Sequence, residues 1–538
     1  MARQILTAVA VLAGLLAVFL AALGGRNGAE SEVVIDYGPG QNNTVLFLTN
    51  SEYGLSNVHV ATAQSLIERH PHVRVHFASF PSMAPRIARV CSLARVQNPT
   101  APNITFHELR AQTYAKAVEQ KAGFMNLSSR WFEQGPGLQA YPKMATMIQG
   151  IIAPWDSDAY LALYEEVQEL IQIVDPAVIV LEILLNPATD ATRNADRRHV
   201  FINPGSLSDQ LAFEQPHGKG FWKYPCMSSD MPFPVPWHRI PENVFLVSRF
   251  IYSVFIVPQW RGYYSQLKKF GIPSTPILRD GRGLYMSPHI PGATLPLDVI
   301  SKNTMGTNSI VLRSAMAAHQ DPELANWLER APTLLINLGS VYKYTEESAK
   351  SMAQAIQAVL AQTKVSGTFT SFIHPQRYPV LWKHSPDYEY GDDFKVPLEG
   401  YVAEDRVRVS SWLPTDTMAM LETGHIVASV HHGGANSYHE ALSSGGVPHV
   451  VLPMWVDLYN YAALAEVTGV GIYATRGTAP HWTVENLRKA FLDVVDGPNS
   501  ANMRAKAQHI AQLMRKEPGS HQTARVVADL AAHKSVEN

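Results

Sequence analysis

Apolar strand-like runs alternate with helical stretches along this 538-residue chain, and such alternation is compatible with few folds. Near the start, a buried strand is predicted at 43–50, a helix at 61–70 and an alternating strand at 73–80. Strand, helix and strand at this spacing form a βαβ unit, which implies a parallel sheet. Another buried strand is predicted at 177–185, and Glu182 within it would lie near the carboxyl edge, where open α/β sheets bind ligands.

The second half of the chain repeats this pattern. A helix is predicted at 345–362, and strands are predicted at 333–340, 368–374, 406–412, 424–432 and 450–455. The fold class is therefore α/β, with two doubly wound, Rossmann-like domains facing each other across a cleft. The expected division is an N-terminal hydrophobic segment at 1–30, a first domain at 31–315, a linker at 316–332, a second domain at 333–500 and C-terminal helices at 501–538.

Composition excludes several classes of protein. Hydrophobic residues make up 46% and charged residues 17% of the chain, as in globular proteins. Lys+Arg 44 against Asp+Glu 46 shows no basic excess, which argues against a nucleic-acid partner. With only Cys91 and Cys226, neither a disulfide scaffold nor a cysteine-rich zinc module is possible, and whether the two pair is left open.

Residues 5–25 are uncharged and apolar, long for a cleaved signal and just long enough to span a membrane. We expect a single-pass N-terminal membrane anchor in the endomembrane system. Secretion after signal cleavage and an ordinary buried helix are the alternatives. The run 244–258 is interrupted by Arg249 and favours a core helix or a membrane-facing amphipathic surface. Glycosylation sequons, which weakly favour a lumenal chain, stand at Asn42, Asn103 and Asn126.

The segment 425–462 carries the most specific chemistry. Its predicted strand ends in a turn that contains Gly433 and Gly434, and a helix opens directly afterwards. Paired glycines let the backbone approach a ligand closely, and the free N–H groups of a helix start favour phosphate oxygens. His432, Asn436 and Ser437 add polar groups at the same place.

Two further residues complete this pattern. Glu440 lies one helical turn after Asn436, where a carboxylate can accept hydrogen bonds from the vicinal hydroxyls of a ribose. Trp412, at the end of the preceding strand, offers a flat ring on which a base can stack. Alone, Trp412 would be read as a core aromatic and Glu440 as a solvated helix residue. Together in one ordered block, they predict a nucleotide-diphosphate site.

These residues resemble the donor-binding signature of the UDP-glycosyltransferases, family 1, which have the two-domain GT-B fold, and particularly its fungal branch. The resemblance extends over nearly the whole chain after the N-terminal segment, including 57–82, 203–216 and 320–340. It implies that the first domain binds an acceptor and the second a UDP-sugar. The roles that it implies are uracil stacking by Trp412, ribose binding by Glu440, diphosphate binding by Ser340, His432, Gly433, Gly434, Asn436 and Ser437, and sugar binding by Asp457.

The chain departs from the family pattern in the donor block. Thr415 follows Pro414 where the family commonly has glutamine, and Leu458 follows Asp457 at a position that is often glutamine. The loop after Glu440 also has an additional glycine. Loss of the sugar-contacting glutamine leaves the identity of the donor sugar open.

A second departure concerns the catalytic base. Leu55 occupies the position at which the family usually has its histidine, whereas Glu182 matches the acidic partner of that histidine. His59 lies four residues further on, about one helical turn away. Either Glu182 or His59 is a candidate substitute base that deprotonates the acceptor. The alternatives are a packing histidine and an ordinary polar group at a strand end.

The expected activity is transfer of a hexose, with glucose as the first expectation, from a UDP-sugar to a hydroxyl of a small lipophilic acceptor such as a secondary metabolite or sterol. By resemblance the reaction inverts the anomeric centre. The UDP-sugar is a co-substrate, and neither a cofactor nor a metal is implied. Asp156 and Asp158 match a metal-binding Asp-x-Asp, but helix capping by Asp156 is favoured. A catalytically impaired homologue that binds UDP-sugar or a lipophile, and a UDP-sugar epimerase, are the alternatives.

Overall fold

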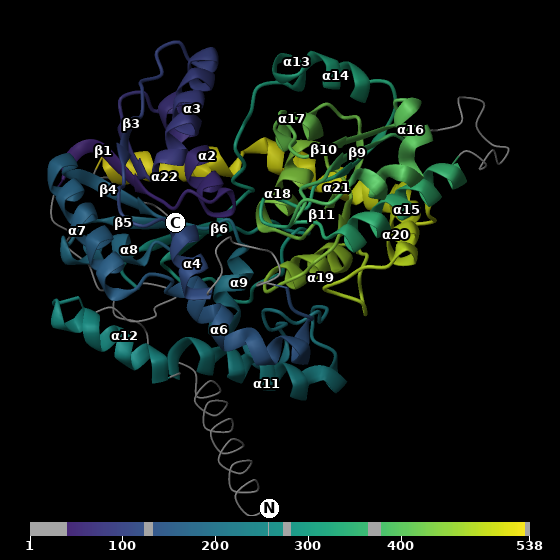
Figure 1. Ribbon diagram of the computed structural model, residues 1–538. Coiled ribbons are helices and arrows are strands. Elements are labelled where there is room, and N and C mark those ends of the chain that lie inside the picture. The colour runs from purple at the N-terminus through teal and green to yellow at the C-terminus, as the bar shows by residue number, and fades with distance from the viewer. Residues whose placement is uncertain (1–39, 123–132, 257, 273–280, 364–377, 533–538) are drawn as a thin grey trace, which may run out of the picture.

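Two parallel sheets with helices on their faces form the two lobes of the molecule (Figure 1). The computed structural model describes residues 40–122, 133–256, 258–272, 281–363 and 378–532. The first sheet has the strand order β3-β2-β1-β4-β5-β6-β7, and the second has the order β10-β9-β8-β11-β12-β13. The α/β class and the two Rossmann-like sheets are thus confirmed.

The strands are short, and the central strands β4, β8 and β11 are buried along their whole length. Their bounds are β1 Gln41–Leu48, β2 Arg74–Ser79, β3 Thr105–Glu108, β4 Pro176–Leu181, β5 His199–Ile202, β6 Leu284–Pro288, β7 Thr304–Thr307, β8 Thr333–Ile336, β9 Val380–Lys383, β10 Val407–Ser410, β11 Ile426–His431, β12 His449–Val451 and β13 Gly471–Tyr473.

The helices of the first lobe are α2 Tyr53–Arg69, α3 Ala84–Gln97, α4 Tyr114–Ala122, α6 Tyr141–Ile152, α7 Ser157–Val174, α8 Asn186–Asn194, α9 Leu207–Leu211, α10 Lys219–Trp222, α11 Ile240–Ile251 and α12 Pro258–Lys269. Those that follow are α13 Ala317–Gln320, α14 Pro322–Leu328, α15 Glu346–Thr363, α16 Glu399–Ala403, α17 Thr417–Glu422, α18 Ala435–Ser444, α19 Leu458–Thr468, α20 Val484–Asp496, α21 Ser500–Lys516 and α22 Gly519–Ala531.

The strand order reverses direction between β1 and β4 in the first sheet and between β8 and β11 in the second. Leu46 pairs with Ile179 across the first of these points, and Ile336 pairs with Val430 across the second. At such a switch point the connections that leave the two strands diverge, so a crevice forms outside their carboxyl ends. In each lobe, the strand order therefore predicts a ligand-binding position at the carboxyl ends of these two strands.

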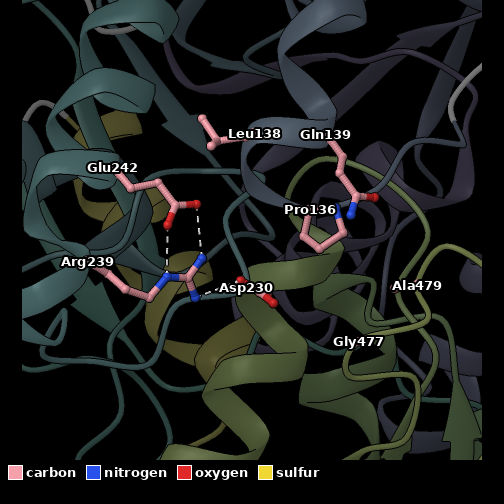
Figure 2. A pocket seen from close by; sticks show the side chains of 8 residues that line it. All are labelled: Pro136, Leu138, Gln139, Asp230, Arg239, Glu242, Gly477 and Ala479. Carbon is pink, nitrogen blue, oxygen red and sulfur yellow. Dashed lines mark hydrogen bonds and ion pairs between the residues drawn. The ribbon is translucent and has the colours of Figure 1, made fainter.

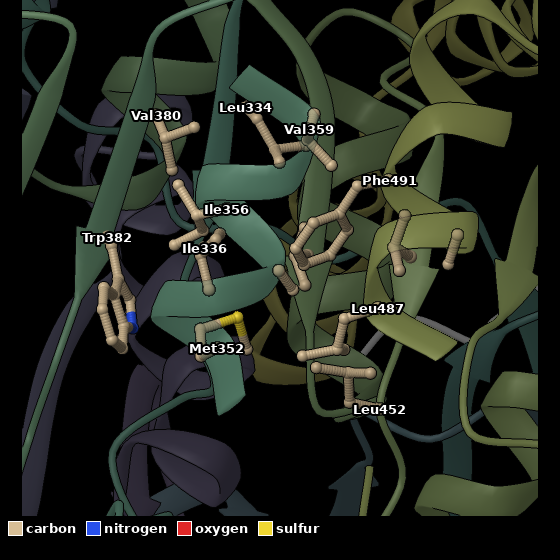
Figure 3. Packing of buried hydrophobic residues seen from close by; sticks show 14 of the residues in the cluster. Leu334, Ile336, Met352, Ile356, Val359, Val380, Trp382, Leu452, Leu487 and Phe491 are labelled. Atoms are coloured by element: carbon tan, nitrogen blue, oxygen red, sulfur yellow. The ribbon is translucent and has the colours of Figure 1, made fainter. Parts of the chain in front are cut away.

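Successive side chains of a strand point to opposite faces of the sheet, so neighbouring residues pack in different hydrophobic clusters. In β8, Leu334 and Ile336 belong to a cluster covered by α15 and α20, whereas Leu335 packs in a different cluster. Figure 3 shows Ile356 of α15 and Phe491 of α20 among the side chains of the first cluster. Burial on both faces explains why the central strands read as continuous apolar runs.

The C-terminal helices connect the two lobes. Helix α21 packs against α18 of the second lobe, whereas α22 contacts α2, β1 and β4 of the first lobe (Figure 1). Val527 and Ala524 of α22 are fully buried in the first-lobe core. The terminal 32 residues described, from 501 to 532, therefore serve both lobes rather than forming a separate unit.

Helix α11 and the residue before α7 have the structural roles predicted from the sequence. Helix α11, which overlaps the apolar run 244–258, is a core helix, because Leu246, Val247 and Phe250 are buried. Asp156 caps α7 by accepting a hydrogen bond from the amide of Ala159 at 2.9 Å, as expected. The strand predicted at 368–374 lies outside the described residues, and β9 was not anticipated.

The predicted N-terminal segment and Asn126 lie outside the described residues, whereas Asn42 and Asn103 are exposed. No helix in the described part of the chain is long and apolar enough to cross a membrane.

Cys91 and Cys226 are both buried free thiols, so they form no disulfide with each other. The expected linker 316–332 contains the short helices α13 and α14.

Candidate active site

The switch point of the first sheet carries a cluster of polar side chains. Glu182, directly after β4, is 1% exposed and accepts a hydrogen bond from Nδ2 of Asn50, which follows β1. Its other oxygen, Oε1, accepts from the amide of Leu184 at 2.7 Å. Burial, with a smaller contribution from the negative charge of Glu52, raises the pKa of Glu182 to about 7. Glu182 is therefore a positioned carboxyl group that titrates near neutral pH.

His59 lies inside the first lobe rather than at its surface. The side chain is fully buried, with Nδ1 3.2 Å from the carbonyl oxygen of Leu55 and Nε2 3.1 Å from that of Leu181. Burial lowers its pKa to about 4. Because both nitrogens face backbone carbonyls, this geometry speaks against His59 as the base and supports the alternative of a packing histidine. Leu55, at the usual base position, packs against an apolar cluster of the first lobe.

The glycine turn after β11 is close-packed around His432. A Cβ added to Gly339, after β8, would lie 2.7 Å from Cε1 of His432, and one added to Gly434 would lie 2.6 Å from its Nε2. The exposed Ser340 follows Gly339 directly. The structure therefore brings Ser340, His432 and Gly434 together at the switch point of the second sheet, although they come from two separate loops.

Gly433 has a structural role that differs from the expected one. Its φ is +96°, and an added Cβ would lie 2.8 Å from the carbonyl oxygen of Leu458. Its amide donates to Nδ1 of His431 at 3.0 Å, so this N–H is committed within the protein. Gly433 thus shapes the turn, and the first-turn amides of α18 are the ones that point to a ligand role.

The first turn of α18 also touches the first lobe. Nδ2 of Asn436 donates to the carbonyl oxygens of Tyr53 and Gly54, at 3.3 and 3.2 Å. These two residues begin α2, directly after Glu52. Ser437 is the next residue of the turn and is partly buried. The predicted diphosphate helix therefore lies against the carboxyl end of β1, where the first-lobe polar cluster is found.

Glu440 is held near a second contact between the lobes. Burial raises its pKa to about 7, and the charge of Asp416 contributes to this increase. Asp416, just before α17, forms two hydrogen bonds with the guanidinium of Arg89 on α3 of the first lobe. The predicted ribose carboxylate thus lies close to an ion pair that joins the two lobes.

Trp412 lies two residues beyond the end of β10, in a loop, and its ring is 55% exposed. Nζ of Lys383, the last residue of β9, lies 4.1 Å from the ring centroid and donates to the carbonyl oxygen of Gly339 at 2.9 Å. Burial, with the nearby charge of Lys343, lowers the pKa of Lys383 to about 8. Lys383 therefore places a positive charge between Trp412 and the turn that packs on His432.

Asp457 directly precedes α19, next to the Leu458 carbonyl that packs on Gly433. Burial raises its pKa to about 6. Across the lobe interface, burial and the charge of Asp457 raise the pKa of Asp209 to about 7. Asp209 accepts a hydrogen bond from the amide of Ser206, and its Oδ2 lies 3.3 Å from the hydroxyl of Tyr461. Asp457, the predicted sugar-binding residue, therefore has a second carboxyl group, that of Asp209, within range of its charge.

Four residues of this region were not predicted from the sequence as site residues. Asn50 and Glu52 follow β1 and Lys383 ends β9, and all three stand at carboxyl ends of strands, which is a signal that could have found them. Asp209 lies in the segment 203–216, which the family resemblance singled out without assigning it a role.

A cavity of about 230 Å³ lies elsewhere between the lobes. Arg239 at its side donates to both oxygens of Glu242, at 3.0 Å each, and to Asp230 at 3.1 Å (Figure 2). Gly477 and Ala479 of the second lobe also line this cavity. None of the predicted donor or base residues lines it, so it is distinct from the candidate active site.

Comparison with known proteins identifies relatives of this chain. The family model described as "Erythromycin biosynthesis protein CIII-like, C-terminal domain" matches residues 399–531, which include the turn, α18 and α19. "Glycosyltransferase sdnJ" from Sordaria araneosa is 30% identical over 527 residues, covering 91% of this chain and 98% of that protein.

Solved structures of low sequence identity share the fold. Os79 from O. sativa, solved in complex with U2F and trichothecene, superposes with a TM-score of 0.56 at 14% identity and covers 91% of this chain and 100% of its own. A UDP-glucosyltransferase from Polygonum tinctorium gives a TM-score of 0.54 at 16% identity and covers 92% and 99%. The full-length match to a glycosyltransferase, together with the GT-B arrangement of two parallel Rossmann-like sheets, shows that this chain belongs to the family 1 UDP-sugar-dependent glycosyltransferases.

Proposed function

We propose that this chain transfers a hexose, with glucose as the first candidate, from a UDP-sugar to a hydroxyl group of a small lipophilic secondary metabolite. The proposed reaction inverts the anomeric centre and needs no metal ion. The observation that carries the proposal is the contact of Asn436 with the backbone of Tyr53 and Gly54. This contact sets the predicted diphosphate helix of the second lobe against the carboxyl cluster of the first.

The donor side of this site matches the charge of a nucleoside diphosphate. The first-turn amides of α18 carry partial positive charge, and Lys383 adds a full one beside Gly339. As the bond between the anomeric carbon and the diphosphate breaks, negative charge grows on the leaving UDP. Donors fixed in advance at that position stabilise this charge in the transition state. In the proposal, they supply the stabilisation for which other glycosyltransferases use a cation.

Binding of the nucleoside rests on two side chains of the second lobe. The exposed ring of Trp412 would stack on uracil, and Glu440 would accept hydrogen bonds from the ribose hydroxyls. Asp457 would bind hydroxyls of the sugar. The charge of Asp457 acts on the carboxyl group of Asp209, which is therefore a second candidate to accept a hydrogen bond from a sugar hydroxyl.

The lipophilic acceptor is proposed from the surface of the first lobe and from the relatives. Large apolar side chains are exposed in its helical part, including Phe213 at 40%, Trp222 at 37% and Trp237 at 82%. An aromatic side chain buries a large apolar area on contact, so exposed ones can contribute to binding an apolar ligand. The matching family model carries the name of an erythromycin biosynthesis protein, which supports a secondary metabolite as the acceptor.

We also propose that residues 5–25 anchor the enzyme in an endomembrane. The uncharged apolar length of this segment supports the proposal. Alkaline carbonate extraction of membranes from cells that express the full chain tests it. An anchored enzyme stays in the pellet, and release into the supernatant or the culture medium would contradict anchoring.

The proposed activity is tested by measuring UDP release from UDP-glucose with EDTA present, against a panel of phenols, terpenoid alcohols and sterols. We expect release that depends on the acceptor, with a glycoside of the expected mass and inverted anomeric configuration by NMR. UDP binding without transfer to any acceptor would instead support an impaired homologue. Conversion of UDP-glucose to an epimeric UDP-sugar would indicate an epimerase.

A further inference from the structure

Glu52 occupies the point where the two halves of the candidate active site meet. It follows β1 and is the N-terminal capping residue of α2, two residues after Asn50. The next two residues, Tyr53 and Gly54, accept hydrogen bonds from Asn436 at the start of α18. The Glu52 side chain therefore starts from the backbone segment that touches the predicted diphosphate helix.

One oxygen of this carboxylate is available. Oε1 accepts a hydrogen bond from the amide of Ala115 at 3.2 Å, which fixes the direction of the side chain. Oε2 is buried, and no donor among the described residues reaches it. An ionised carboxylate can only accept hydrogen bonds, and a buried acceptor without a partner is costly. A hydroxyl group of a bound substrate is a donor that suits Oε2.

Glu182 is less suited to receive a proton from a substrate. Oε2 of Glu182 already accepts from Asn50 and its Oε1 from Leu184, and the side chain is 1% exposed. Burial raises the pKa of both Glu52 and Glu182, and the charge of Glu52 adds to the increase at Glu182. The amides of Ser51 and Glu52 also favour the charged form of Glu52, but only the Ala115 amide lies at hydrogen-bond geometry, on Oε1. Both oxygens of Glu182 are occupied and that residue is buried, whereas Glu52 is half-buried and its Oε2 has no such partner, so Glu52 is the better placed to exchange a proton with a ligand.

We propose that Glu52 is the general base of the reaction, in place of the histidine whose usual position is occupied by Leu55, and that Glu182 is a positioning residue. This inference rests on the proposed transferase function. The acceptor oxygen forms a bond to the anomeric carbon while its O–H bond breaks and the proton passes to Oε2 of Glu52. The bond from the anomeric carbon to the diphosphate breaks, and UDP leaves with the electron pair. Glu52 then releases the proton to water.

The test compares Glu52→Gln with the wild type in the full chain. The introduced amide keeps an oxygen for the Ala115 N–H but cannot accept a proton. With an alcohol acceptor we expect kcat to fall by about 10²–10⁴-fold, the usual contribution of a general base. The Kd for UDP is expected to be unchanged. Glu169→Gln, which alters an exposed carboxylate on α7, serves as the control and should resemble the wild type.

Acceptors of different acidity separate a base from a merely structural residue. A nitrophenol that is ionised at the assay pH has no proton to lose, so Glu52→Gln should lose far less activity with it than with the alcohol. The wild type should lose activity in acid as Glu52 is protonated, and the variant should lack this dependence. Equal losses with both acceptors, or no loss with the alcohol, would overturn the role of Glu52.

The wild type tests the proposed transferase function, and the Glu52→Gln variant tests the role of Glu52. Transfer by the wild type establishes the function whatever the variant does, and the variant then decides the role of Glu52. Failure of the wild type to transfer to either acceptor, with UDP still bound, would overturn the proposed function and the base with it. Circular dichroism and the melting temperature of each variant show whether it is folded.

Discussion

Asn50 donates a hydrogen bond from Nδ2 to Oε2 of Glu182, and this contact joins the carboxyl ends of β1 and β4 across the switch point of the first sheet. Oδ1 of the same amide is buried and receives no hydrogen bond from the described residues. The pair therefore keeps a buried carboxyl group in one orientation, next to the loop that carries Glu52. Burial raises the pKa of this carboxyl group to about 7, so its protonation state changes near neutral pH.

Replacing Glu182 by Gln should change how stability depends on pH. Because the folded pKa of Glu182 is raised to about 7, above that of the unfolded chain, its contribution is fully present below the unfolded pKa and is lost as pH rises. The free energy of unfolding of the wild type, relative to Glu182→Gln, should fall between pH 5 and 8 by up to about 3 kcal/mol. Urea unfolding at both pH values measures it. A difference that is constant with pH would contradict the assigned environment.

Trp412→Ala should weaken UDP binding without destabilising the fold. The ring is 55% exposed, so little packing is lost, whereas base stacking contributes about 1–3 kcal/mol. We expect the Kd for UDP to rise about 10–100-fold in calorimetric titrations. Trp237→Ala, at a more exposed tryptophan of the first lobe, is the control and should bind UDP normally. Unchanged affinity in Trp412→Ala would place uracil elsewhere.

Lys383→Met should reduce affinity for UDP more than affinity for uridine, because the ammonium group is assigned to the diphosphate. Its pKa of about 8 means that the positive charge is lost as pH rises through 8, so wild-type UDP affinity should decline there. The variant should show less of this decline. Lys395→Met removes a charge that is paired with Asp392, and it should have little effect. An equal loss for UDP and uridine would indicate that Lys383 acts only through Trp412.

Gly434→Ala should impair the donor site, because the added methyl group would lie 2.6 Å from Nε2 of His432. The imidazole or the turn must then move, and we expect UDP affinity to fall at least about tenfold, since a shift of this kind misaligns fixed donors. Gly445→Ala, at the other end of α18, is the control. Its added Cβ would have only the Leu421 carbonyl oxygen nearby, at 3.6 Å, which is an ordinary van der Waals contact. Similar behaviour of the two variants would argue against close packing at the turn.

The fold class could be predicted because the strands at the centre of each sheet contain runs of buried apolar residues, such as Val45–Leu48 in β1 and Ala177–Leu181 in β4. The edge strand β3, Thr105–Glu108, was missed since three of its four residues are polar and none of the four is fully buried. Strand β9 was missed because it is short and ends in Lys383, and an apolar stretch shortly before it attracted the prediction. A run of apolar residues indicates a strand that is buried on both faces, and this hydropathy signal is weak where a strand is exposed or very short.

The donor block was predictable for a different reason. The turn, the helix start and Glu440 lie within ten residues of one another, so helical spacing alone sets their relative positions. The contacts of Asn50 with Glu182 and of Lys383 with Trp412 join segments that are distant in the sequence. They depend on strand order and lobe packing, which no local pattern encodes. The commitment of the Gly433 amide to His431 likewise becomes visible only in the folded turn.

We propose that the two lobes together catalyse transfer of a hexose from a UDP-sugar to an acceptor hydroxyl. The most direct measurement incubates the purified full chain with UDP-glucose, EDTA and one acceptor at a time, and quantifies UDP and glycoside together. We expect equimolar UDP and a glycoside of inverted configuration with at least one lipophilic alcohol or phenol. UDP formed without any glycoside, or a glycoside of retained configuration, would contradict the proposed function.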